Sequence, residues 1–113
     1  MSDTPFLLPS VSAAEALALA QSGEAILIDL RKPPAVARDG RRAKGALIRD
    51  PFTFGHDDPL MADERPLIAF CVHGHEVSQF ASALLMVHGC DARYVTGGFE
   101  ALVEAGIETE TAK

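Results

Sequence analysis

The sequence has 113 residues, of which 48% are hydrophobic and 23% charged, enough for one domain with a packed core. Sixteen acidic and ten basic residues give a net charge of −6, which argues against a general nucleic-acid binder or a polybasic membrane clamp. No apolar run approaches the roughly 18–20 residues of a membrane span, and the N-terminus lacks the basic region of a signal peptide. We therefore expect one domain over residues 1–113, with its core at about 6–106, in the cytoplasm, and with both cysteines reduced.

The N-terminal third predicts a strand, a helix and a second strand. Phe6–Leu8 is a short apolar run, and Pro9 should end it. Ser12 and Glu15 have the spacing of a capping box, in which the two side chains satisfy backbone amides at a helix start. The alanine- and leucine-rich segment Ala13–Gln21 favours helix. Next, the continuous apolar run Ala25–Leu30 is typical of a strand buried on both faces.

The middle of the chain is less regular. Pro33–Lys44 is basic and polar, and we expect a loop there with room for one helical turn. Gly45–Ile48 predicts a very short strand. Residues 51–65 are expected to be mostly loop, with a helical turn near Asp58–Met61.

The C-terminal half alternates strands and helices. Pro66–Phe70 predicts a buried strand that runs into Cys71, and a helix from Val77 to His88 should follow. Ala92–Val95 predicts another strand and Phe99–Ala105 a last helix, after which residues 108–113 are expected to be a solvated tail. This order predicts an α/β fold: a mostly parallel twisted sheet of about five short strands, with helices on both faces.

Cys71 is the most informative residue, because ligands of parallel sheets bind at the carboxyl ends of the strands. A turn after the strand should direct backbone N–H groups toward the sulfur, and Gly74 suits such a tight turn. These groups lower a thiol pKa, and the thiolate is the nucleophilic form. The alternative is a buried structural cysteine.

Four segments resemble those of one known family. Cys71–Glu76 resembles the active-site loop of rhodanese sulfurtransferases, and Ile28–Pro33 is similar to that family's Asp-Val-Arg-x-Pro segment. Lys44–Leu47 resembles a shortened Gly-His-Ile-Pro-Gly-Ala segment, and Gly97–Leu102 resembles Gly-Gly-Phe-x-x-Trp. The resemblance covers residues 6–106 and implies a rhodanese-like fold.

The resemblance also implies a mechanism. Cys71 would attack the outer sulfur of a donor such as thiosulfate, hold that sulfur as a persulfide, and pass it to a small thiol, cyanide or a sulfur-carrier protein. It implies no metal and no organic cofactor. The persulfide would be held by the loop residues Val72, His73, Gly74, His75, Glu76 and Val77.

Three residues depart from the family pattern. Leu102 replaces a frequent tryptophan, Val77 a frequent serine, and Glu76 an arginine or serine. A carboxylate at about 5 Å from dianionic thiosulfate costs roughly 1–3 kcal/mol. We therefore hypothesise that thiosulfate is a poor donor and that a persulfide is preferred. Alternatively, Glu76 points to water or caps the following helix.

The histidines raise the question of a metal site. His73 and His75 lie near Cys71, whereas His88 and Cys90 follow a helix of about twelve residues, roughly 18 Å long. That separation argues against a shared zinc site and against a Cys71–Cys90 disulfide. We expect His73 and His75 to favour the Cys71 thiolate, or else to be ordinary exposed residues.

Three further residues are candidates near the site. Asp29 ends a strand beside a basic segment, so we expect it to form structural hydrogen bonds or an ion pair. Arg31 and Arg38 are candidates for attracting an anionic donor.

Other functions remain open. The domain could be a sulfur relay or a partner-binding module with little small-molecule turnover, or an inactive recognition domain. A phosphatase or arsenate reductase of the related type needs an arginine after five spacer residues, where this chain has Val77.

Overall fold

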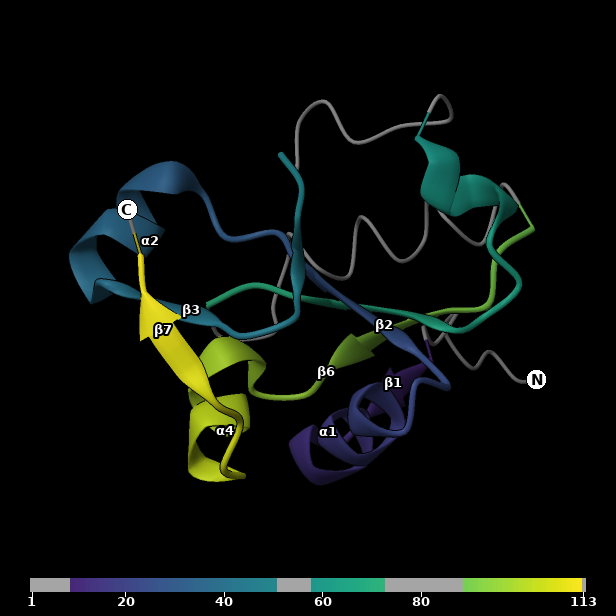
Figure 1. Ribbon diagram of the computed structural model, residues 1–113, viewed down its shortest axis with the longest axis horizontal. Coiled ribbons are helices and arrows are strands. Elements are labelled where there is room, and N and C mark those ends of the chain that lie inside the picture. Colours follow the sequence, from purple (N-terminus) through teal and green to yellow (C-terminus); the bar gives the residue numbers. More distant parts are fainter. Residues whose placement is uncertain (1–8, 51–57, 73–88, 113) are drawn as a thin grey trace, which may run out of the picture.

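The computed structural model describes residues 9–50, 58–72 and 89–112. Five parallel strands form the main sheet in the order β1-β6-β5-β2-β4, so β5 lies at its centre (Figure 1). Within this part of the chain the fold is the expected α/β class, with a parallel sheet of short strands. The strands are β1 (Ser10–Val11), β2 (Ile26–Asp29), β4 (Leu47–Ile48), β5 (Leu67–Phe70) and β6 (Ala92–Val95).

Two layers of apolar side chains sandwich the sheet. Helices α1 (Ala13–Gln21) and α4 (Gly98–Glu104) cover one face, where Ile68 and Phe70 of β5 meet Phe99 (Figure 1). On the opposite face, the other β5 residues pack with Leu60 of the 3-10 helix η1 (Pro59–Ala62). Each residue of β5 is fully buried, which is why this strand reads as a continuous apolar run.

Helix α1 begins as its sequence predicts. The Ser12 side chain accepts a hydrogen bond from the Glu15 backbone N–H at 3.1 Å, and the Glu15 carboxylate accepts one from the Ser12 N–H at 3.2 Å. This capping box satisfies amides that the helix itself leaves without partners. The predicted bounds of α1 and β6 are confirmed.

The expectation for Pro33–Lys44, a loop with one helical turn, is wrong, because most of this segment has regular structure. Residues Pro33–Asp39 form helix α2, and Arg41–Ala43 form strand β3. Proline is tolerated in the first helical turn, because its missing N–H would have no partner there. Gly40 then ends the helix. The basic residues suggest a solvated loop, but Arg38 lies in α2, and Arg41 and Arg42 lie in β3, which pairs with another strand.

The solvated tail expected after Ile107 is also wrong. Thr109–Thr111 form strand β7, which pairs antiparallel with β3 and places the C-terminus beside α2 (Figure 1). All three side chains are exposed, so no apolar pattern indicated the strand. Its stabilising contacts come from residues about 70 positions away in the sequence.

Several expectations fall wholly or partly outside the described residues. The Phe6–Leu8 strand, the segment 51–57 and the helix from Val77 to His88 are among them. The first described strand, β1, comes after Pro9 and pairs with β6.

Candidate active site

Cys71 directly follows the central strand β5, at the carboxyl edge of the sheet. Cys71 is buried, with an exposed fraction of 7%. The backbone N–H of Phe99, in the first turn of α4, donates a hydrogen bond of 2.8 Å to the Cys71 carbonyl oxygen. The start of α4 is therefore fixed against the cysteine, and the sequence segment Gly97–Leu102 lies next to the strand end.

Asp29 and Arg31 lie at the end of the neighbouring strand β2, where Asp29 is in register with Phe70. The Asp29 carboxylate accepts hydrogen bonds from the Arg31 backbone N–H at 2.9 Å, and from the guanidinium Nε and Nη2 at 3.1 and 2.9 Å. Both residues are buried, with exposed fractions of 1% and 4%. The Arg31 Nη2 also donates to the Arg41 carbonyl at 2.8 Å, so the pair ties β2 to β3.

Phe99 contacts the ion pair through its ring and Cys71 through its backbone N–H. The Arg31 guanidinium lies 3.9 Å from the centre of the Phe99 ring, and Phe99 stacks on Phe70 with 6.2 Å between ring centres. A guanidinium over an aromatic face is attracted by the negative charge of the ring face. Phe99 therefore holds Arg31 in place from the side of α4.

A cavity of about 250 Å³ lies between α2, α4 and the residue after Cys71. It brings together Arg31, Arg38 and Val72, three of the residues singled out from the sequence. The Arg41 side chain, through its hydrogen bond, keeps the pKa of the cavity residue Asp39 below its usual range, so that carboxylate is ionised at neutral pH. The lining comprises Arg31, Ala35, Arg38, Asp39, Val72, Phe99 and Glu100.

Sequence reasoning missed Ala35, Asp39, Phe99 and Glu100 as lining residues. The signal for the first two was present, because two prolines and, after five more residues, Gly40 mark the start and end of a short helix. Phe99 was identified only as part of a family motif. Its contact with Arg31 depends on how β2 and α4 meet, which no local pattern specifies.

The loop residues His73, Gly74, His75, Glu76 and Val77 lie outside the described residues, and their expected roles remain predictions. Within the ranges 9–50, 58–72 and 89–112, no group of three or more His, Cys, Asp or Glu side chains is placed to hold a metal ion. In the same ranges, no helix is both long enough and apolar enough to cross a membrane.

Cys90 differs from Cys71 in its position. It precedes β6 and packs beside the apolar cluster on the η1 face, as expected for a small packed residue. Burial raises the pKa of the Cys90 thiol, which leaves less thiolate at neutral pH. Cys90 is therefore a suitable control for experiments on Cys71.

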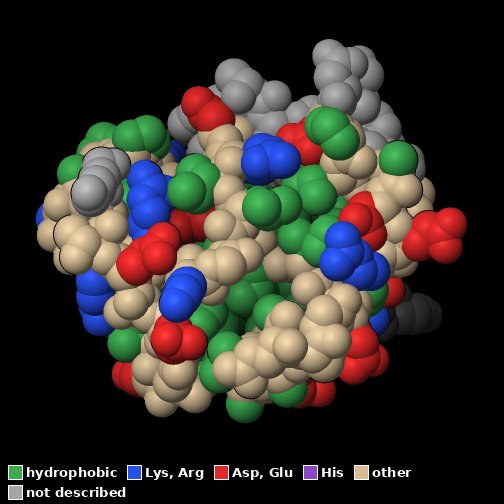
Figure 2. All heavy atoms as spheres, viewed as in Figure 1, with side chains coloured by type: hydrophobic (Ala, Val, Ile, Leu, Met, Phe, Trp, Pro, Cys, Tyr) green, Lys and Arg blue, Asp and Glu red, His purple; other side chains and the backbone are tan. Residues whose placement is uncertain are grey.

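Many charged side chains of the described residues form pairs of opposite sign. On the face seen in Figure 2, acidic and basic groups are interspersed. Three exposed pairs repeat the Asp-x-Arg spacing of the buried pair, with contacts of 2.8–3.1 Å. These pairs are Asp39–Arg41, Asp63–Arg65 and Asp91–Arg93.

The central cysteine and the parallel sheet define an α/β domain with a thiol at the carboxyl edge of its middle strand. The family model for the rhodanese-like domain matches residues 12–105. The chain therefore belongs to the rhodanese-like family, which comprises sulfurtransferase and sulfur-relay domains, and the resemblance seen in the sequence is confirmed.

Solved structures have the same fold at low sequence identity. A thiosulfate sulfurtransferase from Pseudomonas aeruginosa matches with a TM-score of 0.77 and 17% identity, over 94% of this chain and 20% of that one. The rhodanese-like domain of an Anabaena protein matches with a TM-score of 0.74 and 17% identity, over 94% and 81%. A Rhodopseudomonas palustris protein of unknown function, described as a possible tyrosine phosphatase, matches with a TM-score of 0.76 and 23% identity, over 91% and 85%.

Proposed function

We propose that the protein is a sulfurtransferase in which Cys71 carries the transferred sulfur as a persulfide. The position of Cys71 carries this proposal. In a rhodanese-like fold, Cys71 directly follows the central strand, and the next residue, Val72, lines the cavity that also contains Arg31 and Arg38. A nucleophile at a strand end, beside a cavity lined by two arginines and by two acidic residues, is suited to attack a small donor that the arginines bind.

The reaction proceeds in two balanced steps. The Cys71 thiolate attacks the outer sulfur of the donor, a new S–S bond forms, and the donor's own S–S bond breaks, so that thiosulfate releases sulfite with the bonding electron pair. A thiolate or cyanide then attacks the outer sulfur of the persulfide and regenerates the Cys71 thiolate. We propose that the backbone amides of residues 72–77 stabilise the persulfide anion between the two steps.

Donor choice depends on opposing charges. Arg31 and Arg38 line the cavity and attract an anionic donor, whereas Asp39 and Glu100 in the same lining, together with Glu76, repel dianionic thiosulfate. Because the Arg31 charge is already matched by Asp29, Arg38 is the better candidate for donor attraction. Arg38→Gln should raise the KM for thiosulfate about three- to tenfold, and Glu76→Ser should lower it. If Glu76→Ser leaves the KM for thiosulfate unchanged, repulsion by the Glu76 carboxylate does not explain donor choice.

A sulfur relay to a partner protein is the second candidate. The rhodanese-like family includes sulfur-relay domains, and a cavity of about 250 Å³ has room for a small donor, so an acceptor protein would present its thiol from outside. A phosphatase is not proposed, because Val77 stands where that chemistry needs an arginine to bind the oxyanion.

Intact-protein mass spectrometry tests the proposal. After brief incubation with thiosulfate, or with glutathione persulfide, the wild type and Cys90→Ser should gain about 32 Da, and a reducing thiol should remove it. Cys71→Ser should gain nothing. A folded protein that gains no mass from either donor would contradict the sulfurtransferase proposal and favour a partner-dependent relay or a binding module.

A further inference from the structure

Phe99 contacts the cysteine and the buried ion pair at the same time. Its backbone N–H donates a hydrogen bond of 2.8 Å to the Cys71 carbonyl oxygen. Its ring lies against the Arg31 guanidinium, 3.9 Å from the ring centre, and stacks on Phe70 of β5. Phe99 is only 1% exposed, so water does not compete for these contacts. The position of α4 is therefore transmitted directly to the residue that carries the thiol.

Two glycines bring Phe99 to this place. Gly97 and Gly98, which follow β6, have left-handed backbone with φ of +84° and +66°. Two successive left-handed residues are readily formed only by glycine. Because β6 lies beside β5 in the sheet, the turn after β6 falls next to Cys71, and the Phe99 N–H meets the Cys71 carbonyl.

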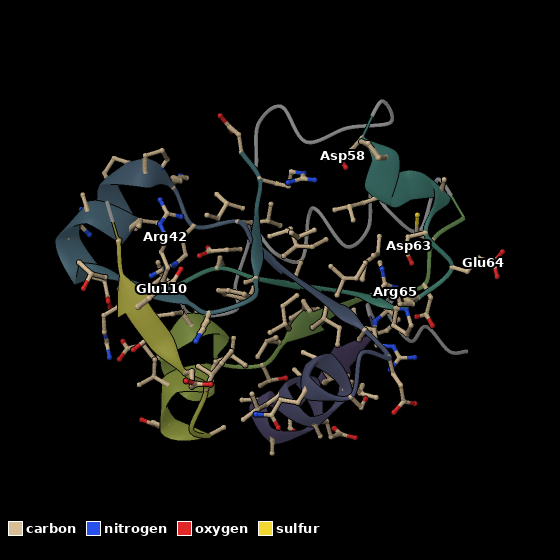
Figure 3. All side chains as sticks on the ribbon, in the orientation of Figure 1. Arg42, Asp58, Asp63, Glu64, Arg65 and Glu110 are labelled. Atoms are coloured by element: carbon tan, nitrogen blue, oxygen red, sulfur yellow. The ribbon has the colours of Figure 1, made fainter. Side chains whose placement is uncertain are left out.

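Strands β2 and β3 hold the ring of Phe99. Arg31 follows β2, and Arg41 of β3 places a second guanidinium 5.5 Å from the ring centre. Strand β3 is in turn paired with β7, where Glu110 lies opposite Arg42, as Figure 3 shows. Guanidinium groups are attracted to the face of an aromatic ring. The ring therefore fixes the start of α4 against two strands as well as against β5.

The hydrogen bond from Phe99 acts on the peptide group that follows Cys71. The Cys71 carbonyl and the Val72 N–H belong to one planar peptide, which is trans like the other peptide bonds of the described residues. Holding the carbonyl toward α4 therefore holds the Val72 N–H in the opposite direction. A carbonyl that accepts a hydrogen bond also makes the N–H of the same peptide a stronger donor, because hydrogen bonds in a chain polarise one another.

We propose that Phe99 is a positioning residue for the chemistry at Cys71. Its backbone N–H orients and polarises the Cys71–Val72 peptide, and its ring keeps that N–H in place. This inference rests on the proposed role of Cys71 and deepens it, since the Val72 N–H is the first of the amides proposed to stabilise the persulfide anion. The same amides stabilise the free thiolate, so the effect extends to a reaction that needs no sulfur donor.

Replacing a single backbone N–H by an ester oxygen tests the proposal without changing a side chain. Gly89–Cys90 is a suitable junction for native chemical ligation, so a synthetic segment 90–113 with an ester at residue 99 can be joined to residues 1–89. The matched control has its ester at residue 105, whose N–H donates to the Ala101 carbonyl at 2.9 Å at the end of α4. Both proteins keep every charged side chain, including those at the strand end and the cavity, which are Asp29, Arg31, Arg38, Asp39 and Glu100.

The pH profile of iodoacetamide alkylation, followed at Cys71 by peptide mass spectrometry, reports the thiolate. Loss of the Phe99 N–H makes the thiolate less stable, so the ester at residue 99 should raise the midpoint of the profile by about 0.3–1 pH unit. The ester at residue 105 should leave the midpoint unchanged. Persulfide formation from thiosulfate should slow about three- to tenfold at residue 99 with the KM unchanged, because the side chains of the cavity are the same. Phe99→Leu keeps the N–H and should shift the midpoint less than the ester does.

Three results would overturn the role of Phe99. They are an unchanged alkylation midpoint with the ester at residue 99, an equal shift with the ester at residue 105, and an equal shift in Phe99→Leu. The last would assign the effect to packing of the ring and not to the N–H. Failure of the sulfur-transfer proposal gives a different result, in which wild-type Cys71 is alkylated but gains no sulfur from thiosulfate or glutathione persulfide.

Discussion

The buried Asp29–Arg31 pair offers a sharp test of how this fold is held together. Replacing Asp29 by Asn keeps the size of the side chain but removes its negative charge. The positive charge of Arg31, which is only 4% exposed, then stays buried without a counter-charge. Breaking one partner of a buried ion pair typically costs about 3–5 kcal/mol of unfolding free energy. The total stability of a domain is only about 5–15 kcal/mol, so the effect should be large.

The chain supplies its own matched control. Asp91 and Arg93 have the same spacing and the same paired contacts, at 3.2 and 3.1 Å, but their side chains are 49% and 31% exposed. Asp91→Asn should cost only about 0.2–1 kcal/mol, because solvent screens an exposed pair. The comparison therefore holds the guanidinium contacts constant, and the two pairs differ in burial and in the Arg31 backbone N–H that donates to Asp29.

Urea denaturation followed by circular dichroism measures both variants. With a slope of about 1.5 kcal/mol/M, Asp29→Asn should lower the urea midpoint by about 2–3 M, and Asp91→Asn by less than about 0.7 M. The double variant Asp29→Leu/Arg31→Met should be more stable than Asp29→Asn, because it removes the unpaired charge. Equal midpoints for Asp29→Asn and Asp91→Asn would refute the reasoning.

Two further predictions concern a turn and a pH dependence. Gly97→Ala should cost about 2–4 kcal/mol, because φ is +84° there and the new Cβ would lie 2.8 Å from the Ala101 Cβ. Gly23→Ala, with φ +81° and open space, should cost only about 1–2 kcal/mol, and equal losses on thermal unfolding would contradict this contact. At Asp58, burial raises the pKa, but hydrogen bonds from the Arg49 side chain and the Leu60 N–H, together with the Arg49 charge, outweigh it and lower the pKa. A lowered pKa stabilises the fold above the unfolded value of about 4 and loses that effect as pH falls through the folded value. Asp58→Asn should therefore be about 1 kcal/mol less stable than the wild type at pH 7, and this difference should shrink below pH 4; a constant difference would count against the pKa assignment.

The sequence predicted those parts of the fold whose signals are local. The capping box at Ser12 and the buried apolar strand before Cys71 are examples, because each depends on residues close in sequence. Strand β7 depends on pairing with β3, about 70 residues away, and its exposed Thr-Glu-Thr sequence has no pattern of its own. Helix α2 is longer than the single turn expected, because the proline and glycine signals at its two ends lie in a segment whose basic residues, mostly those of β3 and beyond, suggested a loop.

The candidate site was predictable in part for the same reason. Cys71 could be placed at a strand end from its neighbours alone. The sequence contains four Asp-x-Arg segments, and nothing within them tells which one is buried. That difference comes from the position of β2 between β4 and β5, which encloses Asp29 and Arg31.

Locating the transferred sulfur tests the account most directly. The protein is loaded with a persulfide donor and alkylated, and its peptides are sequenced by tandem mass spectrometry. The account predicts one additional sulfur on Cys71 and none on Cys90, whose thiol pKa is raised by burial. Sulfur on Cys90, or equal labelling of both cysteines, would contradict the assignment of Cys71 as the sulfur carrier.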